Sequence, residues 1–408
     1  MRLRLRQRDR RNFDNGTMFN KIIDFVKKET VLSAAAVLAV LSAFIVRPDA
    51  QYASYINFRV LAILTGLMIV MEGFKKLGVF ARIAGILLSH VKSDTGIGLI
   101  LIGLCFGFSM FITNDVALIT FVPLTIETLK RSGRMKHLIH IVVMQTAAAN
   151  LGSMLTPVGN PQNLYLYDLM QMEVGDFILL MLPLTAISGG LIFLIFGCWN
   201  KASAIKAAKF GKVNDTDEFT VSDDKQDTDD GKRGHISRRF ILLYTVLFVF
   251  NLLTVFDIVK FWIPLAVTVL AILITDRKTL IKVDYSLIFI FIAFFIFVGN
   301  MGRIPEFSSM LGSAVEGREM GIAILSSQVI SNVPAALLLS GFTEDYRALL
   351  YGVDIGGLGT LIASMASLIS YKYVAVEDKK LRLKYLIRFT VVNIMLLIPL
   401  YILGRILL

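Results

Sequence analysis

The sequence predicts an all-α polytopic membrane protein that contains two inverted repeats, re-entrant hairpins and broken transmembrane helices. Its composition is the first observation: 55% of the 408 residues are hydrophobic, only 18% are charged, and the mean hydropathy is +0.68. A soluble domain has about 25% charged residues. The second observation is a series of apolar runs that approach the roughly 20 residues needed to cross a bilayer. The third is a pair of polar, glycine-rich interruptions, one in each half of the chain.

The two interruptions resemble degenerate copies of one design. When residues 150–163 are laid on residues 354–367, Gly152 coincides with Gly356 and Thr156 with Thr360, and Asn150 falls opposite Asp354. Interrupted apolar segments in corresponding positions of two halves indicate the binding site of a transporter.

The apolar runs define the expected elements in chain order. Spanning segments are predicted over 30–46, 57–74, 138–172, 176–199, 239–256, 260–275, 285–301, 346–371 and 385–405. Residues 96–130 and 319–342 each contain two short apolar arms that meet at a polar tip, which is typical of a re-entrant hairpin. An interfacial helix is expected before each hairpin, over 77–91 and 304–315. Pro157 and Pro161 together predict a break in the third span, at 156–163.

These elements divide the chain into four parts. They are a basic N-terminus with the first transmembrane helix (1–54), a first inverted repeat (55–200), a polar linker (201–238), and a second half with the second repeat (239–408). Lys and Arg concentrate in cytoplasmic loops, so the arginine-rich N-terminus is expected in the cytoplasm. Counting spans and hairpins from that end places the linker, which is not net basic, on the same side. The same charge pattern gives the two halves opposite orientations, as in an inverted repeat. The linker is polar and is predicted to be largely disordered. Its acids could suggest a calcium loop, but they do not have the required spacing.

Several classes of function are disfavoured by the same observations. The net charge of +11 does not indicate nucleic-acid binding, because the basic residues lie between hydrophobic runs. Cys105 and Cys198 are read as packing residues. Gly73 and Gly78 have the spacing of a phosphate loop, but the required Lys-Ser/Thr pair is absent. An enzyme or an ATP-driven pump is therefore not expected.

Broken helices supply the expected chemistry. A break leaves unpaired N–H and C=O groups and partial charges near +0.5 and −0.5. Helix N-termini accept an anion, and exposed carbonyls suit Na⁺ or a protonated group. Four breaks, two at hairpin tips and two in crossing helices, are expected to meet near the midplane. Neutral ligands at the breaks are Asn114, Asn150, Asn160, Asn163, Thr156, Ser331, Asn332, Thr360 and Ser364.

Two carboxylates fall at the expected depth of the site. An acid in the bilayer costs roughly 2.5–3.5 kcal/mol, so it usually has a partner or a function. Asp115 is a candidate for binding the coupling ion or proton, and the alternative is a cap for the second hairpin arm. Asp354 has the same two interpretations.

These motifs carry a family resemblance. Residues 111–123 resemble the first hairpin tip of the ion transporter superfamily, and residues 156–163 are similar to its first unwound motif. Residues 331–334 and 356–367 resemble the second-half counterparts. The superfamily includes arsenite permeases, divalent-anion/Na⁺ symporters, citrate transporters and one class of Na⁺/H⁺ antiporters. The resemblance covers most of the chain from about residue 55 onward.

The resemblance implies a scaffold domain and a transport domain that moves as an elevator, in a homodimer. It also implies that the substrate or ion site is lined by Thr113, Asn114, Thr156, Gly159, Asn160, Ser331, Asn332, Thr360 and Ser364, with possible Na⁺ sites at Asn114 and Asn332. Leu361 and Ala363 stand where many relatives carry proline and glycine. This departure argues against a two-Na⁺ dicarboxylate mechanism.

The expected function is secondary active transport of a small anion or oxyacid, coupled to H⁺ or Na⁺. Citrate and arsenite remain open as substrates, and no cofactor beyond the coupling ion is expected. The alternatives are an arsenite or antimonite exporter, a channel, and a Na⁺/H⁺ antiporter in which Asp115 and Asp354 bind the cation directly. The expected location is a prokaryotic inner membrane, with the N-terminus in the cytoplasm.

Overall fold

The computed structural model describes residues 26, 29–91, 93–209 and 238–408, and every regular element in these ranges is helical. The first half contains α2 (Thr30–Ile45), α3 (Tyr52–Tyr55), α4 (Phe58–Lys76), α5 (Val79–Ser89), α6 (Asp94–Ile112), α7 (Asn114–Arg131), η1 (Met135–His137), α8 (Leu138–Gly152), η2 (Ser153–Leu155), α9 (Pro161–Met170) and α10 (Val174–Lys209). The second half contains α11 (Arg238–Val255), α12 (Trp262–Lys282), α13 (Ser286–Gly302), α14 (Pro305–Val315), α15 (Glu319–Ile330), α16 (Asn332–Leu339), η4 (Ser340–Phe342), α17 (Tyr346–Gly356), α18 (Met365–Glu377) and α19 (Leu381–Leu407).

The chain is a multi-span membrane protein. In the described ranges, five helical segments are long and apolar enough to cross a membrane: 94–112, 135–155, 174–201, 238–255 and 381–407. A sixth span is possible if α12 and α13, which are bent by 76° at their junction, count as one. The sequence predicts nine spans, but α2 and α13 have only 16 and 17 residues. Conversely, α6 is long enough to cross alone, although the sequence assigns it to a hairpin arm.

The ends of two predicted elements differ from the structure. Helix α10 continues to Lys209, into the segment predicted as a linker, because residues 202–209 are mostly Ala and Lys, which are strong helix formers. The remainder of that linker, 210–237, lies outside the described residues, as does the basic stretch 1–25. The break predicted at 156–163 instead ends at Asn160, because Pro161 occupies the first turn of α9, where no N–H is needed.

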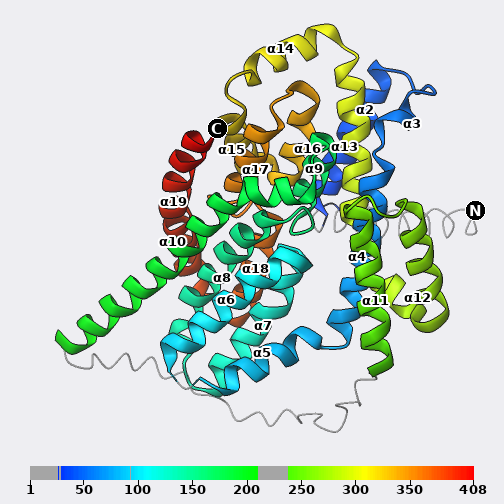
Figure 1. Ribbon diagram of the computed structural model, residues 1–408. Coiled ribbons are helices and arrows are strands. Elements are labelled where there is room, and N and C mark those ends of the chain that lie inside the picture. The colour runs from blue at the N-terminus through cyan, green and yellow to red at the C-terminus, as the bar shows by residue number, and fades with distance from the viewer. Residues whose placement is uncertain (1–25, 27–28, 92, 210–237) are drawn as a thin grey trace, which may run out of the picture.

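The helices form two groups that are visible in Figure 1. In one group α2 packs against α13, and α4 packs against α11 and α12. In the other, α6 packs against α8, α15 packs against α17, and α18 packs against α7 and α8. The short helices α5 and α14 lie at opposite ends of the molecule (Figure 1). Four helix interruptions fall inside the second group, and they bring the predicted site residues together.

Candidate functional site

The two hairpin tips share one unusual backbone conformation. Helices α6 and α7 are joined at Thr113, with φ 69° and ψ 150°, and helices α15 and α16 are joined at Ser331, with φ 76° and ψ 155°. This region is almost restricted to glycine, and a residue held there costs about 1–3 kcal/mol. Both tips therefore store backbone strain, which the surrounding contacts must offset.

Each tip is tied by the same backbone bond to the helix break of its own half. The N–H of Asn114 donates to the carbonyl of Gly159 at 3.2 Å, and the N–H of Asn332 donates to the carbonyl of Ala363 at 3.0 Å. The two N–H groups are orphan donors at the starts of α7 and α16, which is why they need a partner outside their own helices.

A hydroxyl from each break adds a second tie to the same hairpin. Thr156 Oγ1 donates to the carbonyl of Met110, and Thr360 Oγ1 donates to the carbonyl of Gln328 at 3.2 Å. Both carbonyls lie three residues before a tip. Thr156 and Thr360, which coincide when the two interruptions are aligned, therefore have the same structural role.

The two halves are also joined directly. Asn160 Nδ2 lies 3.4 Å from Asp354 Oδ1, and Ser364 Oγ donates to Asn150 Oδ1 at 3.1 Å. Each of these bonds connects the break of one half to the helix end of the other half, and all four side chains are buried. The four interruptions therefore meet in one place, which we call the junction.

The amide of Asn150 is saturated within the junction. Its Oδ1 accepts from Asn114 Nδ2 and from Ser364 Oγ, both at 3.1 Å. Its Nδ2 donates to the carbonyl of Gly357 and to Ser367 Oγ, both at 3.3 Å. A primary amide has two N–H donors and two acceptor lone pairs, so Asn150 uses its full capacity.

Asp354, which occupies the equivalent position in the second half, is not saturated. Its Oδ1 accepts from Gln162 Nε2 at 3.1 Å and lies near Asn160. Its Oδ2 is buried and has no hydrogen-bond partner in the part of the chain that the structure describes. Asp354 also forms no ion pair with a described residue. An uncompensated carboxylate at membrane depth costs about 3 kcal/mol.

The other predicted residues lie around this centre. Asn163 is fully buried, and its Nδ2 contacts the carbonyls of Ser153, Met154 and Thr156, so it holds the first break in shape. Thr360 is exposed. Asp115 is half-buried at the start of α7, and its carboxylate forms no hydrogen bond or ion pair with a described residue.

Three residues that hold the junction are not predicted as site residues. Gln162 lies inside the Asn-Pro-Gln-Asn motif, and its place in that motif could have identified it as a site residue. Gln328 donates to the carbonyls of Gly356 and Leu358 and accepts from the N–H of Thr360, and thereby holds the second break against α15. Ser367, the partner of Asn150, also lies inside an aligned segment.

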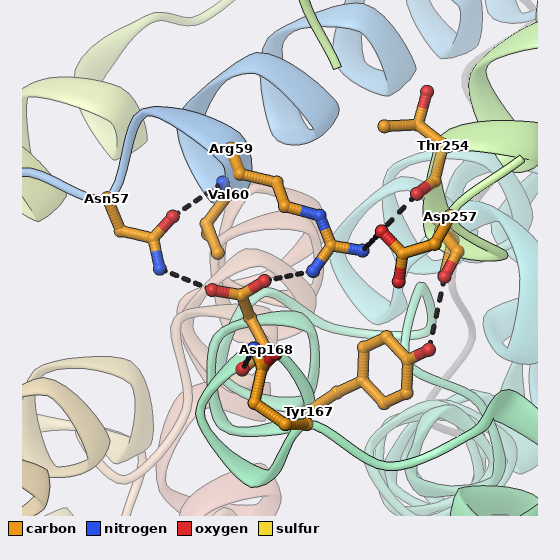
Figure 2. Close-up of polar contacts among 9 residues, drawn as sticks. Asn57, Arg59, Val60, Tyr167, Asp168, Thr254 and Asp257 are labelled. Carbon is orange, nitrogen blue, oxygen red and sulfur yellow. Dashed lines mark hydrogen bonds and ion pairs between the residues drawn. The ribbon is translucent and has the colours of Figure 1, made fainter. Parts of the chain in front are cut away.

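A cluster of charged and polar side chains connects the two groups of helices, as Figure 2 shows. Arg59 at the start of α4 contacts Asp168 of α9, and its other nitrogen lies 2.7 Å from the carboxylate of Asp257, which follows α11. Asn57 Nδ2 donates to the second oxygen of Asp168 at 2.5 Å. We call these four residues the Arg59 clasp. No sequence pattern relates Asp168 and Asp257 to Asn57 and Arg59, because these segments are far apart along the chain.

Asp168 and Asp257 allow a matched test of the clasp. The side chain of Asp168 is 12% exposed and that of Asp257 is 72% exposed, and both contact Arg59. We expect Asp168→Asn to lower the free energy of unfolding by about 1.5–3 kcal/mol, as for a hydrogen bond to a charged group. Asp257→Asn should cost less than about 1 kcal/mol, as for a surface pair. Unfolding of the purified protein in lipid would measure both, and equal effects would contradict this assignment.

The fold and the junction define a class of protein: a multi-span membrane protein whose interrupted helices meet in its interior, an arrangement typical of secondary transporters. Residues 19–344 match the citrate transporter family, and the chain belongs to that family. It is therefore a membrane transporter and not an enzyme.

The chain is also similar to two membrane proteins of known sequence. Over 290 residues the chain is 34% identical to the uncharacterized transporter MJ0456 of Methanocaldococcus jannaschii. This match covers 70% of the present chain and 73% of the relative. Over 335 residues the chain is 28% identical to the inner membrane protein YbiR of Escherichia coli. This match covers 81% of the present chain and 84% of the relative.

Proposed function

We propose that this protein is a secondary active transporter that moves a small anion or oxyacid through the junction, coupled to H⁺ or Na⁺. The observation that carries the proposal is the meeting of the four interruptions around Asn150 and Asp354. In secondary transporters, discontinuous helices provide the substrate and ion sites at such a meeting point. The description of the matched family makes a carboxylate such as citrate the first substrate to test.

The junction has the groups that an anion requires. Helices α7, α9, α16 and α18 all begin at one of the four interruptions. Each helix start carries about +0.5 charge, which favours a carboxylate or an oxyanion. Asn114 and Asn332 stand at the first positions of two of these helices, and their side-chain amides can add neutral donors without a permanent charge.

The recurrence of the tip contacts supports an inverted repeat with two re-entrant hairpins. The two tips make the same backbone bond to their own breaks, and α5 and α14, which precede the hairpins, lie at opposite ends (Figure 1). In this proposal α2, α4 and α11–α14 form a scaffold, and α6–α10 with α15–α19 form a transport domain that moves as an elevator. That movement has to separate the Arg59 clasp, which links the two groups.

The proposal extends to location and assembly. The E. coli relative is described as an inner membrane protein, and the Lys/Arg pattern supports an N-terminus in the cytoplasm of the same kind of membrane. A homodimer is the expected assembly, because the scaffold of an elevator transporter must stay fixed while the other domain moves.

A Na⁺/H⁺ antiporter is the second candidate. It is favoured by one observation, the buried Asp354 carboxylate with an unpartnered oxygen. An antiporter would bind its cation at this carboxylate and would need no anion.

Transport by the purified full-length protein in proteoliposomes tests both candidates. We expect saturable uptake of labelled citrate or arsenite that depends on an imposed pH or Na⁺ gradient. Asn332→Ala should raise the KM about tenfold, because one hydrogen bond to a charged ligand contributes about 1.5 kcal/mol. A Na⁺-dependent change of internal pH without any anion would establish the antiporter instead. Flux that does not saturate would contradict both and indicate a channel.

A further inference from the structure

We propose that the carboxyl group of Asp354, together with the amides of Gln162 and Asn163, is a proton-binding site in the second half of the junction. The inference rests on the proposed function, because it names the group that would carry the coupling ion. It goes beyond that function in choosing the proton over sodium and in choosing Asp354 over Asp115.

The difference between the two equivalent positions is the first step. Asn150 and Asp354 coincide when the two halves are aligned, and both are buried where the halves meet. Every donor and acceptor of Asn150 has a partner, so that position holds the junction together. Asp354 keeps one buried oxygen that has no partner in the described part of the chain. Asp354 therefore has an acceptor oxygen available for binding, whereas Asn150 has none.

Three unpartnered oxygens indicate the kind of occupant. Oδ2 of Asp354, Oε1 of Gln162 and Oδ1 of Asn163 are all buried and have no hydrogen-bond partner among the described residues. The Gln162 amide is already placed against Asp354 by its nitrogen, at 3.1 Å. All three oxygens are acceptors, so the group lacks a hydrogen. A proton on Oδ2 turns that oxygen into a donor, which can then pair with the amide oxygen of Gln162, whose nitrogen already contacts the same carboxylate.

Sodium fits this environment less well. A hard cation such as Ca²⁺ takes about six to eight oxygen ligands, whereas this group offers three unpartnered oxygens among the described residues. Two amide nitrogens, Gln162 Nε2 and Asn160 Nδ2, also point at the other carboxylate oxygen. Their N–H groups place positive charge beside the site, which opposes a metal ion but not a neutral carboxylic acid.

No charge from the neighbouring helices neutralises Asp354. The groups that face it from α9 are amides. Helix α15 carries charge only at Glu319, which is bonded to Gly317 and Thr343, and Asp168 of α9 belongs to the Arg59 clasp. Helix α16 has no charged residue, and α19 carries its basic residues near its two ends. In the described ranges none of these charged groups, nor His140 of α8, forms a hydrogen bond or ion pair with Asp354. Protonation is therefore the available route to neutrality.

The experiment is an infrared titration of the full-length protein in lipid, over about pH 5 to 9, where buried carboxyl groups titrate. We expect a carbonyl band of a protonated carboxylic acid that disappears as the pH rises. Asp354→Asn should remove this band. Asp345→Asn should leave it unchanged: Asp345 is exposed at the N-cap of the same helix, and asparagine serves equally well as an N-cap. Asp115→Asn should also leave the band in place.

Other outcomes would overturn the inference. A spectrum of Asp354→Asn that retains the band would do so, as would loss of the band in Asp115→Asn. Replacing choline chloride with sodium chloride at constant pH should not change the band; its loss in sodium would show that Na⁺ takes the site. If Asp354→Asn does not fold, Gln162→Leu is the second variant. It removes an N–H that stabilises the charged carboxylate, so the band should persist to higher pH, and an unchanged titration would contradict the site.

The titration uses no substrate, so it is independent of the proposed function. A titrating Asp354 in a protein that transports no anion would leave the proton site intact and refute anion transport. Anion transport by a protein that shows no such band would support the proposed function and refute the proton site.

Discussion

Replacement of Asn150 by leucine should destabilise the protein by about 4 kcal/mol or more and abolish transport. Leucine is similar in size but cannot form hydrogen bonds, so it leaves four buried groups without their partner: Asn114 Nδ2, the carbonyl of Gly357, Ser364 Oγ and Ser367 Oγ. Each buried polar group left unsatisfied costs about 1–3 kcal/mol. The loss falls on both halves at once, so the junction should come apart before the rest of the helices.

Chemical unfolding in lipid, followed by tryptophan fluorescence, would measure the change. Asn393→Leu is the matched control, because Asn393 is also fully buried but its amide nitrogen bonds only to the carbonyl of Phe389 in its own helix. Its Oδ1 already has no described partner. We expect the control to change the free energy of unfolding by less than about 1 kcal/mol. A similar loss in both variants would show that Asn150 is an ordinary buried amide.

The second large effect is expected from Gly159→Ala, which should cost about 3 kcal/mol and reduce transport by more than about tenfold. A Cβ at this position would lie 2.1 Å from the carbonyl oxygen of Ser153, which is backbone and cannot rotate away. The break must therefore shift. Because the carbonyl of Gly159 accepts from the N–H of Asn114, the first hairpin tip should shift with it.

Gly107→Ala is the control for this substitution. Gly107 lies inside α6, and a Cβ there meets nothing within 4 Å. Alanine is the better helix former, so this variant should gain about 0.5–1 kcal/mol and transport normally. Unfolding and uptake measured on both variants would separate a steric effect at the break from a general sensitivity to the methyl group. Normal transport by Gly159→Ala would mean that the tip does not depend on the break.

Much of the helix pattern could be predicted from the sequence, because apolar runs and proline positions are local signals. Helices α5 and α14 occupy the segments 77–91 and 304–315, where interfacial helices are expected, and the helix pairs α6–α7 and α15–α16 are joined at Thr113 and Ser331. The ends of elements were less predictable. Lys209 lies in a polar stretch that still favours a helix, and Pro161 starts α9 instead of interrupting it, since proline both breaks and begins helices.

The candidate site was predictable as a set of residues but not as a set of contacts. Asn114, Asn150, Asn160, Asp354 and Ser364 are all in the predicted set, and direct hydrogen bonds now connect them. Their partners depend on how two distant segments cross, and spacing along the chain does not report this. For the same reason Gln162 escaped prediction although it lies within the motif.

By itself the sequence determined that this chain is a multi-span helical membrane protein with two related interruptions, because hydrophobic content and glycine and proline positions act locally. Only the tertiary structure decided what each interruption does. It showed Asn150 saturated, left one oxygen of Asp354 without a described partner, and brought Arg59 to Asp168 across the two groups of helices. Hydrogen bonds act over about 3 Å, so their partners are defined only after the chain has folded.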